Sequence, residues 1–202
     1  MAYPVRMRRT LFVFTLLVAA GLSAILLGQA PRSWTVKDAP AEYQEAAARA
    51  MKAFDEVQST LSARLMEEMK AGGPTRAIVV CRDEAIPLTT KVAVGQSGMA
   101  LGRTSHLVRN PANAPREWMR PFVQKAAGRK AADVQPVVVD LGARVGVLRP
   151  IGTAGACTTC HGAKESQPEA LKRLLAESYP QDKATGFAEG DLRGFFWAEV
   201  NR

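Results

Sequence analysis

The sequence predicts an α+β domain in which helices flank an antiparallel sheet. Three observations support this: a long amphipathic pattern near the N-terminus, two apolar runs that form a hairpin pattern in the second half, and a closing run rich in aromatic residues. Helical and strand patterns do not alternate regularly, as they do in a parallel α/β sheet. The length of 202 residues suits one domain with an additional terminal segment.

Residues 1–30 have the layout of an export segment. Arginines without an acidic residue precede an uncharged apolar run at 11–28, and Gly28 and Ala30 are small residues suited to a cleavage site. The run is also long enough to remain as a membrane anchor with its arginines on the cytoplasmic side. We therefore expect a periplasmic protein, either soluble after cleavage of a signal peptide or anchored to the inner membrane.

A polar, proline-bounded linker is expected at 31–39 and a helix at 40–71, the first element of a domain that spans 40–202. Apolar residues recur in the helix at steps of three and four: Tyr43, Ala47, Ala50, Phe54, Val57, Leu61 and Leu65. Gly72, Gly73 and Pro74 end the pattern. The stripe is rich in alanine and spans few heptads, which favours packing on its own domain, with a homodimer as the alternative.

The middle of the chain mixes strand and helix signals. "RAIVVC" at 76–81 is β-branched and predicts a buried strand, whereas "LTTKVAVGQ" at 88–96 fits helix or strand equally. The segment 98–115 predicts a strand that ends in a turn-rich loop. A short helix is expected at 116–129, with Pro121 as an internal flaw.

The second half carries the clearest strand signals. "QPVVVDLGARVGVLRPIG" at 135–152 predicts an antiparallel hairpin, because two apolar runs surround a short turn sequence. An amphipathic helix is expected at 167–178, a loop at 179–191 and a closing strand at 192–200.

Composition argues against two function classes. The formal net charge is +8, yet the chain has no run of lysine and arginine of the kind that binds nucleic acid, so we expect no nucleic-acid partner. A Ser/His/Asp set, a carboxylate pair and a phosphate-binding loop are not recognisable, so enzymatic turnover is not expected.

The pentad from Cys157 to His161, "CTTCH", holds two of the three cysteines and one of the two histidines. With two residues between them, Cys157 and Cys160 can both reach the vinyl groups on one porphyrin edge, and His161 can bind the iron; this is the attachment signature of c-type haem. The alternatives are a disulfide and a zinc site. A redox dithiol would suit a thioredoxin setting, and zinc would want four ligands in separated pairs. We expect one covalent haem c.

The second axial ligand would set the function of the haem. A methionine suits electron carriers, a thiolate suits sensing, and an empty position binds gases. The candidates are Cys81, His106 and the seven methionines. None of the methionines has a distinctive sequence context. Cys81 ranks slightly above His106, because it is the one cysteine outside the pentad and lies far from it in sequence.

Four stretches together resemble a family of c-type monohaem proteins with a PAS-like sensor domain, long catalogued as a domain of unknown function. They are "GGPTRAIVVC", "GRTSHLVRNPANAPREW", the "RPIG" before the pentad, and "YPQDKATGFAEGDLRGFFWAEV". The resemblance implies a PAS-like sheet and an iron held by His161 and by Cys81, on the strand after the glycine turn. It leaves His106 as a bystander or a substitute ligand.

Two arginines in the matching stretches, Arg103 and Arg109, are candidates for binding haem propionates. A guanidinium group binds a carboxylate through two parallel hydrogen bonds. The alternative is that both are ordinary surface charges.

The sequence as a whole predicts an exported or membrane-anchored haem sensor of redox state or of a diatomic gas, which would signal through a redox partner or a signalling protein. A periplasmic monohaem electron carrier is the first alternative. A four-helix cytochrome with its CxxCH near the C-terminus is the second, although the strand patterns make poor bundle helices.

Overall fold

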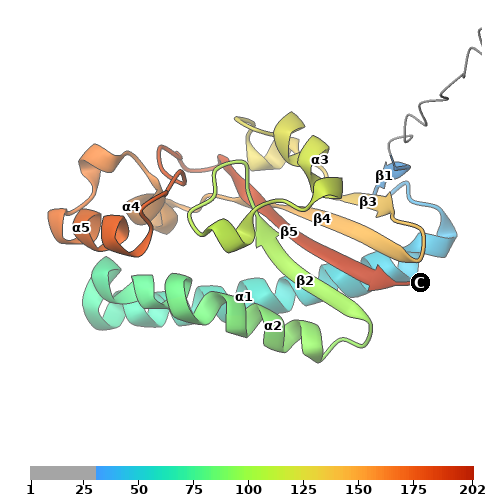
Figure 1. Cartoon of the computed structure of the whole chain (residues 1–202), viewed down its shortest axis with the longest axis horizontal. Coiled ribbons are helices and arrows are strands. Elements are labelled where there is room, and N and C mark those ends of the chain that lie inside the picture. Colours follow the sequence, from blue (N-terminus) through green and yellow to red (C-terminus); the bar gives the residue numbers. More distant parts are fainter. Residues whose placement is uncertain (1–30) are drawn as a thin grey trace, which may run out of the picture. The chain divides into compact units, whose positions relative to one another are not determined.

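Five antiparallel strands form one sheet in the order β1-β3-β4-β5-β2 (Figure 1). The computed structural model describes residues 31–202, so the export segment predicted at 1–30 lies outside the described residues. The strands are β1 (Ser33–Thr35), β2 (Met99–Thr104), β3 (Val137–Asp140), β4 (Arg144–Gly152) and β5 (Leu192–Asn201). The sheet and its helices confirm the predicted α+β class.

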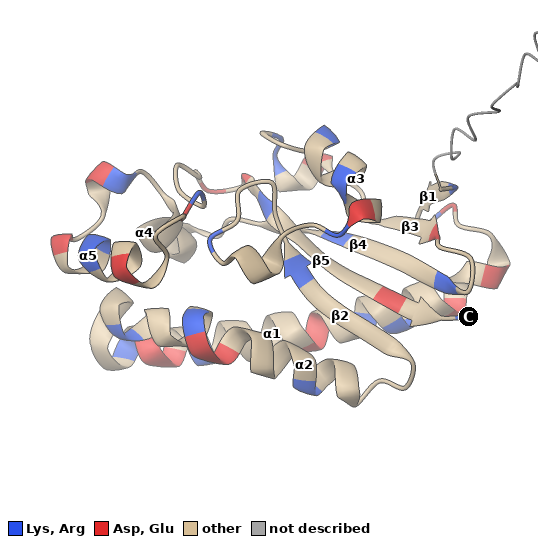
Figure 2. Cartoon of the chain, in the orientation of Figure 1, with Lys and Arg blue, Asp and Glu red and all other residues tan. Residues whose placement is uncertain are grey.

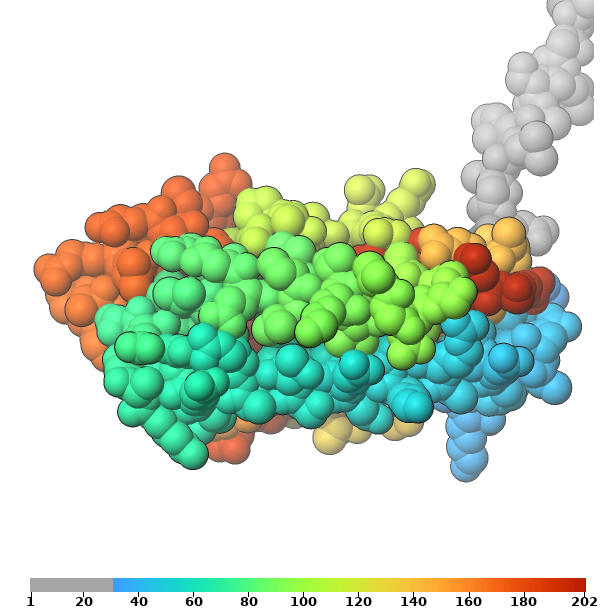
Figure 3. All heavy atoms as spheres, turned by 90° about the horizontal axis from the view of Figure 1, so that it is seen from below, coloured from blue at the N-terminus to red at the C-terminus, as the bar shows by residue number. Residues whose placement is uncertain are grey.

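Helices cover both faces of the sheet. The long helix α1 (Ala41–Val79) and α2 (Ala85–Val94) cover one face, and Figure 3 shows them side by side on it. The short α3 (Arg120–Lys125) lies on the other face, whereas α4 (Thr158–His161) and α5 (Glu169–Ser178) lie beyond one end of the strands (Figure 1).

Strand β5 shows why both faces need a cover. Phe196, Ala198 and Val200 pack in the core under α1, whereas Phe195 and Trp197 pack with the residues of α3. Successive side chains of a strand point to opposite faces of the sheet. An almost uninterrupted apolar strand such as β5 can therefore bury all of its side chains only if helices cover both faces.

Helix α1 is broken where the glycines predicted a stop, but the chain resumes a helix at once. Gly72 and Gly73 have non-helical backbone angles, and the positive φ of 70° at Gly73 favours glycine. Pro74 then opens a second helical segment, a position where its missing N–H costs nothing. The strand predicted at 76–81 is therefore wrong: these residues are helical and lead into a π-helical turn, Val80–Glu84, and then α2.

The other predicted elements differ from the structure in small ways. The hairpin of β3 and β4 is confirmed, as are the closing strand and the helix before it. Residues 33–35 of the expected linker form β1 and pair with β3 at the sheet edge. Pro121 lies in the first turn of α3, where proline is tolerated, so it does not flaw that helix.

None of the helices between residues 31 and 202 combines the length and the apolar character needed to cross a membrane. The anchor or signal predicted for 11–28 falls in the part of the chain that is not described.

Candidate functional site

The CxxCH pentad forms a compact helical turn. A 3₁₀ turn, Gly155–Cys157, leads directly into α4, and the Thr158 hydroxyl donates to the Gly155 carbonyl at 2.7 Å. Cys157 and Cys160 are both free thiols, so the disulfide alternative is not formed. The turn follows the end of β4, which places it at the helical end of the sheet.

His161 is held in one tautomer. Its Nδ1 lies 2.7 Å from the carbonyl oxygen of Ala184, and because a carbonyl only accepts, Nδ1 carries the proton and Nε2 keeps a free lone pair. Burial, followed by the positive charges of Arg193 and Arg109, holds the pKa of His161 well below its ordinary value. A neutral imidazole with one nitrogen anchored and the other free is the form that binds a metal.

Arg109 braces this turn. It is buried, pairs with Asp182 through Nε at 2.9 Å, and donates from Nη2 to the carbonyls of Cys160 at 2.6 Å and Ala184 at 3.2 Å. It is therefore not the surface charge of the sequence alternative. Among the described contacts, Nη1 is the one guanidinium nitrogen of Arg109 without a partner. The structure therefore gives Arg109 a positioning role. A contact between Nη1 and a haem propionate stays a prediction.

The structure brings Cys81 to the same region, on the π-helical turn that follows the glycine break. Ile78, three residues earlier, packs with Leu171 and Leu175 of α5, and Cys160 lies against the same cluster. Burial raises the pKa of the Cys81 thiol, partly offset by the charges of nearby arginines, and raises that of Cys160 to about 11. The charge of Cys81 contributes to raising the pKa of Cys160, and that of Cys157 to raising the pKa of Cys81, so the three thiols lie in one region.

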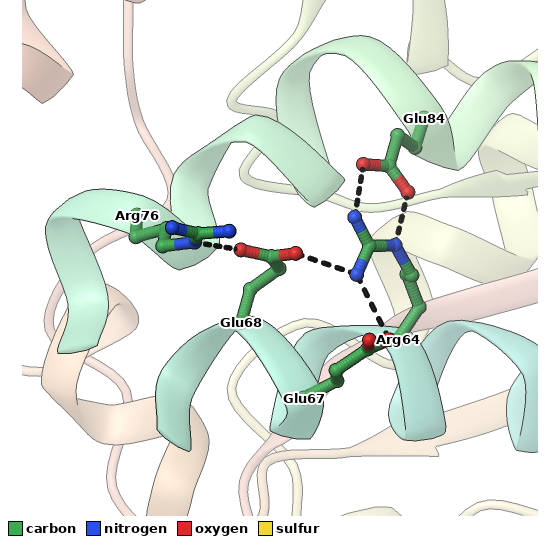
Figure 4. Close-up of polar contacts among 5 residues, drawn as sticks. All are labelled: Arg64, Glu67, Glu68, Arg76 and Glu84. Atoms are coloured by element: carbon green, nitrogen blue, oxygen red, sulfur yellow. Dashed lines mark hydrogen bonds and ion pairs between the residues drawn. The ribbon is translucent and has the colours of Figure 1, made fainter. Parts of the chain in front are cut away.

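An ion-pair cluster, Arg64–Glu68–Arg76–Glu84, ties the segment around Cys81 to the part of α1 before the glycine break (Figure 4). Arg64 of α1 donates to Glu84 from Nε at 2.8 Å and from Nη2 at 3.1 Å, and its Nη1 lies 2.6 Å from Glu68. Glu68 also pairs with Arg76, which precedes Cys81. Glu84 follows Cys81 by three residues, so the segment that carries the thiol is fastened at both ends.

Arg103 lies on β2 and faces the helical layer, opposite Phe196 of β5. Among the described residues its guanidinium group forms no hydrogen bond or ion pair. Burial lowers its pKa, while the nearby Cys81 and Tyr179 raise it. It lines a cavity of about 270 Å³ together with Gly102 and Trp197.

Two further residues lie in this region. Arg193 was not predicted as part of the site, and His106 was predicted as a bystander or a substitute ligand. Arg193, at the start of β5, stacks on Phe187 with its Cζ 5.2 Å from the ring centroid. Phe187 also contacts the rings of His161 and His106, with centroids 6.4 and 5.8 Å away. His106 has a buried Nδ1 without a partner. No local motif marks Arg193, since only the register of β5 brings it here.

Between residues 31 and 202, no group of three or more His, Cys, Asp or Glu side chains is arranged to hold a metal ion.

Comparison with known proteins decides the family. The family model described as Tll0287-like matches residues 36–200. The chain belongs to the Tll0287-like family. The crystal structure of the cyanobacterial haem protein Tll0287 aligns with a TM-score of 0.57 and 22% identity, over 81% of this chain and 98% of that one. A search of curated proteins found no match.

The Tll0287-like assignment confirms the resemblance seen in the four sequence stretches, and the structural alignment confirms the fold. The sheet contradicts the four-helix cytochrome alternative. The PAS-like character of the sheet stays a prediction.

Proposed function

We propose that this chain is an exported or membrane-anchored protein that carries one covalent haem c, attached through Cys157 and Cys160, with His161 and Cys81 as axial ligands. One observation carries the proposal: His161 presents a free Nε2 beside two free thiols on the same helical turn. The relative Tll0287 is a haem protein, which supports the same cofactor here.

The residues present fit this group. Each thiol would add across one vinyl group, forming a carbon–sulfur bond while its hydrogen goes to the other vinyl carbon, so attachment needs no oxidant. Cys81 and His161 supply a soft and a nitrogen donor from different elements, as two axial ligands must. When bound, haem supplies an iron that changes oxidation state and binds small ligands.

A sensing role follows from the place of Cys81. A thiolate ligand stabilises ferric iron, so reduction favours its loss, which would open a position for a diatomic gas. Cys81 lies just after a glycine break and inside a charged cluster that joins it to α1. A change in the ligation of Cys81 would therefore bias the position of α1. A sensor that is not an enzyme needs such a change of structure to signal to a separate redox or signalling partner.

Absorption and electron paramagnetic resonance spectra of the exported, haem-loaded protein test this. We expect the ferric wild type to show a low-spin thiolate signature that Cys81→Ser abolishes, and we expect reduction to change the ligation. Asp83→Asn is the matched control, because Asp83 lies on the same turn, is exposed and, among residues 31–202, pairs only with Arg82. It should leave the spectra unchanged.

The electron carrier is the second candidate, since the same buried residues would also hold a stable six-coordinate iron. The electron carrier becomes the favoured function over the sensor if Cys81 stays bound to the iron on reduction. Identical spectra for wild type and Cys81→Ser would remove Cys81 from the iron, and His106 or a methionine would then be tested.

A further inference from the structure

Three arginines gather where β2 ends and β5 begins. Arg103 lies on β2, Arg109 in the loop that follows it, and Arg193 on β5, and Figure 2 shows basic positions on both strands at this end. The two strands are neighbours, and the Ser105 hydroxyl donates to the backbone carbonyl of Arg193 at 2.7 Å. Burial, followed by the charges of the other two arginines, lowers the pKa of Arg193 to about 10.

The described residues do not balance this charge. Asp182 pairs with Arg109 and acts on Arg193 without forming an ion pair with it in the described structure. Arg103 and Arg193 form no ion pair with any of residues 31–202. Both residues are half-buried, and a cation that is partly removed from water without an anion is destabilised, so two positive charges here favour two negative charges brought by a ligand.

The two arginines lie beside the candidate site and keep free donors. Each acts electrostatically on both Cys81 and His161, and Arg193 also stacks on Phe187, which contacts His161. Arg103 uses none of its N–H groups within the described structure. Arg193 donates once, to the Leu107 carbonyl at the long distance of 3.3 Å.

We propose that Arg103 and Arg193 bind the two carboxylates of haem, one each. This rests on the proposed haem function. A guanidinium fork matches a carboxylate in geometry and charge, and haem carries two propionates for the two unpaired cations. Arg193 thus joins the site as a binding residue, while Arg109 acts by positioning the CxxCH turn.

Haem and its dimethyl ester distinguish this site from general haem binding. In the Cys157→Ala/Cys160→Ala variant the cofactor binds reversibly, so ferric haem and the ester can be titrated separately. We expect haem to bind more tightly than the ester. Arg103→Leu and Arg193→Leu should each weaken haem about 10- to 100-fold and leave the ester nearly unchanged, because each removes charge-assisted hydrogen bonds that the ester cannot form.

Arg173→Leu is the matched control, because Arg173 is exposed on α5 and its loss changes the net charge equally. Equal affinities for haem and ester in the parent variant would overturn the proposal. So would arginine variants that weaken both compounds equally, since that indicates a structural role.

The covalently loaded protein gives a second readout. Removing a positive charge beside the haem favours the ferric state, so Arg103→Leu and Arg193→Leu should lower the midpoint potential while Arg173→Leu leaves it unchanged. An unchanged potential in both variants would contradict the carboxylate site. Wild-type protein exported without attached haem would instead overturn the proposed function.

Discussion

The buried pair of Arg109 and Asp182 shows how a single interaction positions the candidate site. Asp182 accepts from the guanidinium at 2.9 Å and from the amide of Ala184 at 2.8 Å. The carbonyl of Ala184 in turn accepts from His161, and that of Cys160 accepts from Arg109. One carboxylate therefore links the 182–184 loop to Cys160 and His161 of the turn.

Asp182→Asn is expected to be strongly destabilising. Both partners are buried, at 8% and 10% side-chain exposure, so neutralising Asp182 leaves the charge of Arg109 uncompensated. We expect a loss of about 3 kcal/mol in the free energy of unfolding, measured by urea denaturation. Glu169→Gln breaks only the exposed pair with Lys172 and should cost less than about 1 kcal/mol. Equal effects of the two substitutions would contradict the bracing role.

At this scale the sequence predicted what is local. Cys157, Cys160 and His161 form a contiguous pattern whose chemistry depends on spacing alone. Arg193 depends on the register of two strands far apart in sequence, and the positioning role of Arg109 depends on a residue 73 positions away. Neither relation has a local signature, so single-sequence reasoning could name Arg109 as a candidate for binding a propionate but could not find its positioning role.

At the scale of elements, the segment 74–84 connects the part of α1 before the glycine break to the candidate site. It begins at the glycine break, carries Cys81 on a π-helical turn and ends at Glu84. Turns of this kind occur often at functional sites, because the extra residue redirects a side chain. The ion-pair cluster with α1 is what holds the segment in place.

Arg64→Met should loosen this segment without disturbing the sheet. The substitution removes the hydrogen bonds to Glu84 and the contact with Glu68, so the amides of 74–84 should exchange hydrogen several-fold faster, measured by mass spectrometry of peptides. Glu67→Gln removes only the exposed outer partner of Arg64 and serves as the control. Exchange that rises equally in β4 and β5 would show global destabilisation and contradict a local clamp.

The segment 76–81 also shows why some elements could not be predicted. A short β-branched run is typical of a buried strand, but a buried helix of the same length looks alike by periodicity. In the structure, the segment 76–81 is helical because it lies between Pro74, which begins a helical segment, and α2 at 85–94. The sequence of α2 was itself ambiguous between helix and strand. The hairpin of β3 and β4 was predictable because its turn and both strands are contiguous.

At the scale of the whole molecule, β4 connects two ends of the sheet with different roles. It begins at the hairpin turn and ends at Gly152, five residues before Cys157. At the hairpin end, Asp140 accepts from the Gly142 amide at 2.9 Å, from Arg32 at 2.6 Å and from the Tyr43 hydroxyl at 2.9 Å. This carboxylate joins the chain before β1, the start of α1 and the hairpin, far along the sheet from the candidate site (Figure 1).

Asp140 should make the stability of the fold depend on acid pH. The Gly142 amide, followed by Arg32 and Tyr43, lowers its pKa from 3.8 to about 2. Because the folded pKa is the lower one, the stabilisation is fully present above the ordinary pKa and is lost as pH falls from about 4 to about 2. The advantage of the wild type over Asp140→Asn in urea unfolding should therefore be constant near neutral pH and shrink across that interval.

Glu56→Gln controls for the lost charge, because Glu56 is exposed on α1 and forms no ion pair among the described residues. Its difference from the wild type should show no such decline between pH 4 and 2. Since Asp140 lies at the opposite end of β4 from the CxxCH turn, Asp140→Asn should also leave the spectra of the haem-loaded protein unchanged at neutral pH. A wild-type advantage that stays constant down to pH 2 would mean that these three hydrogen bonds do not favour the charged carboxylate.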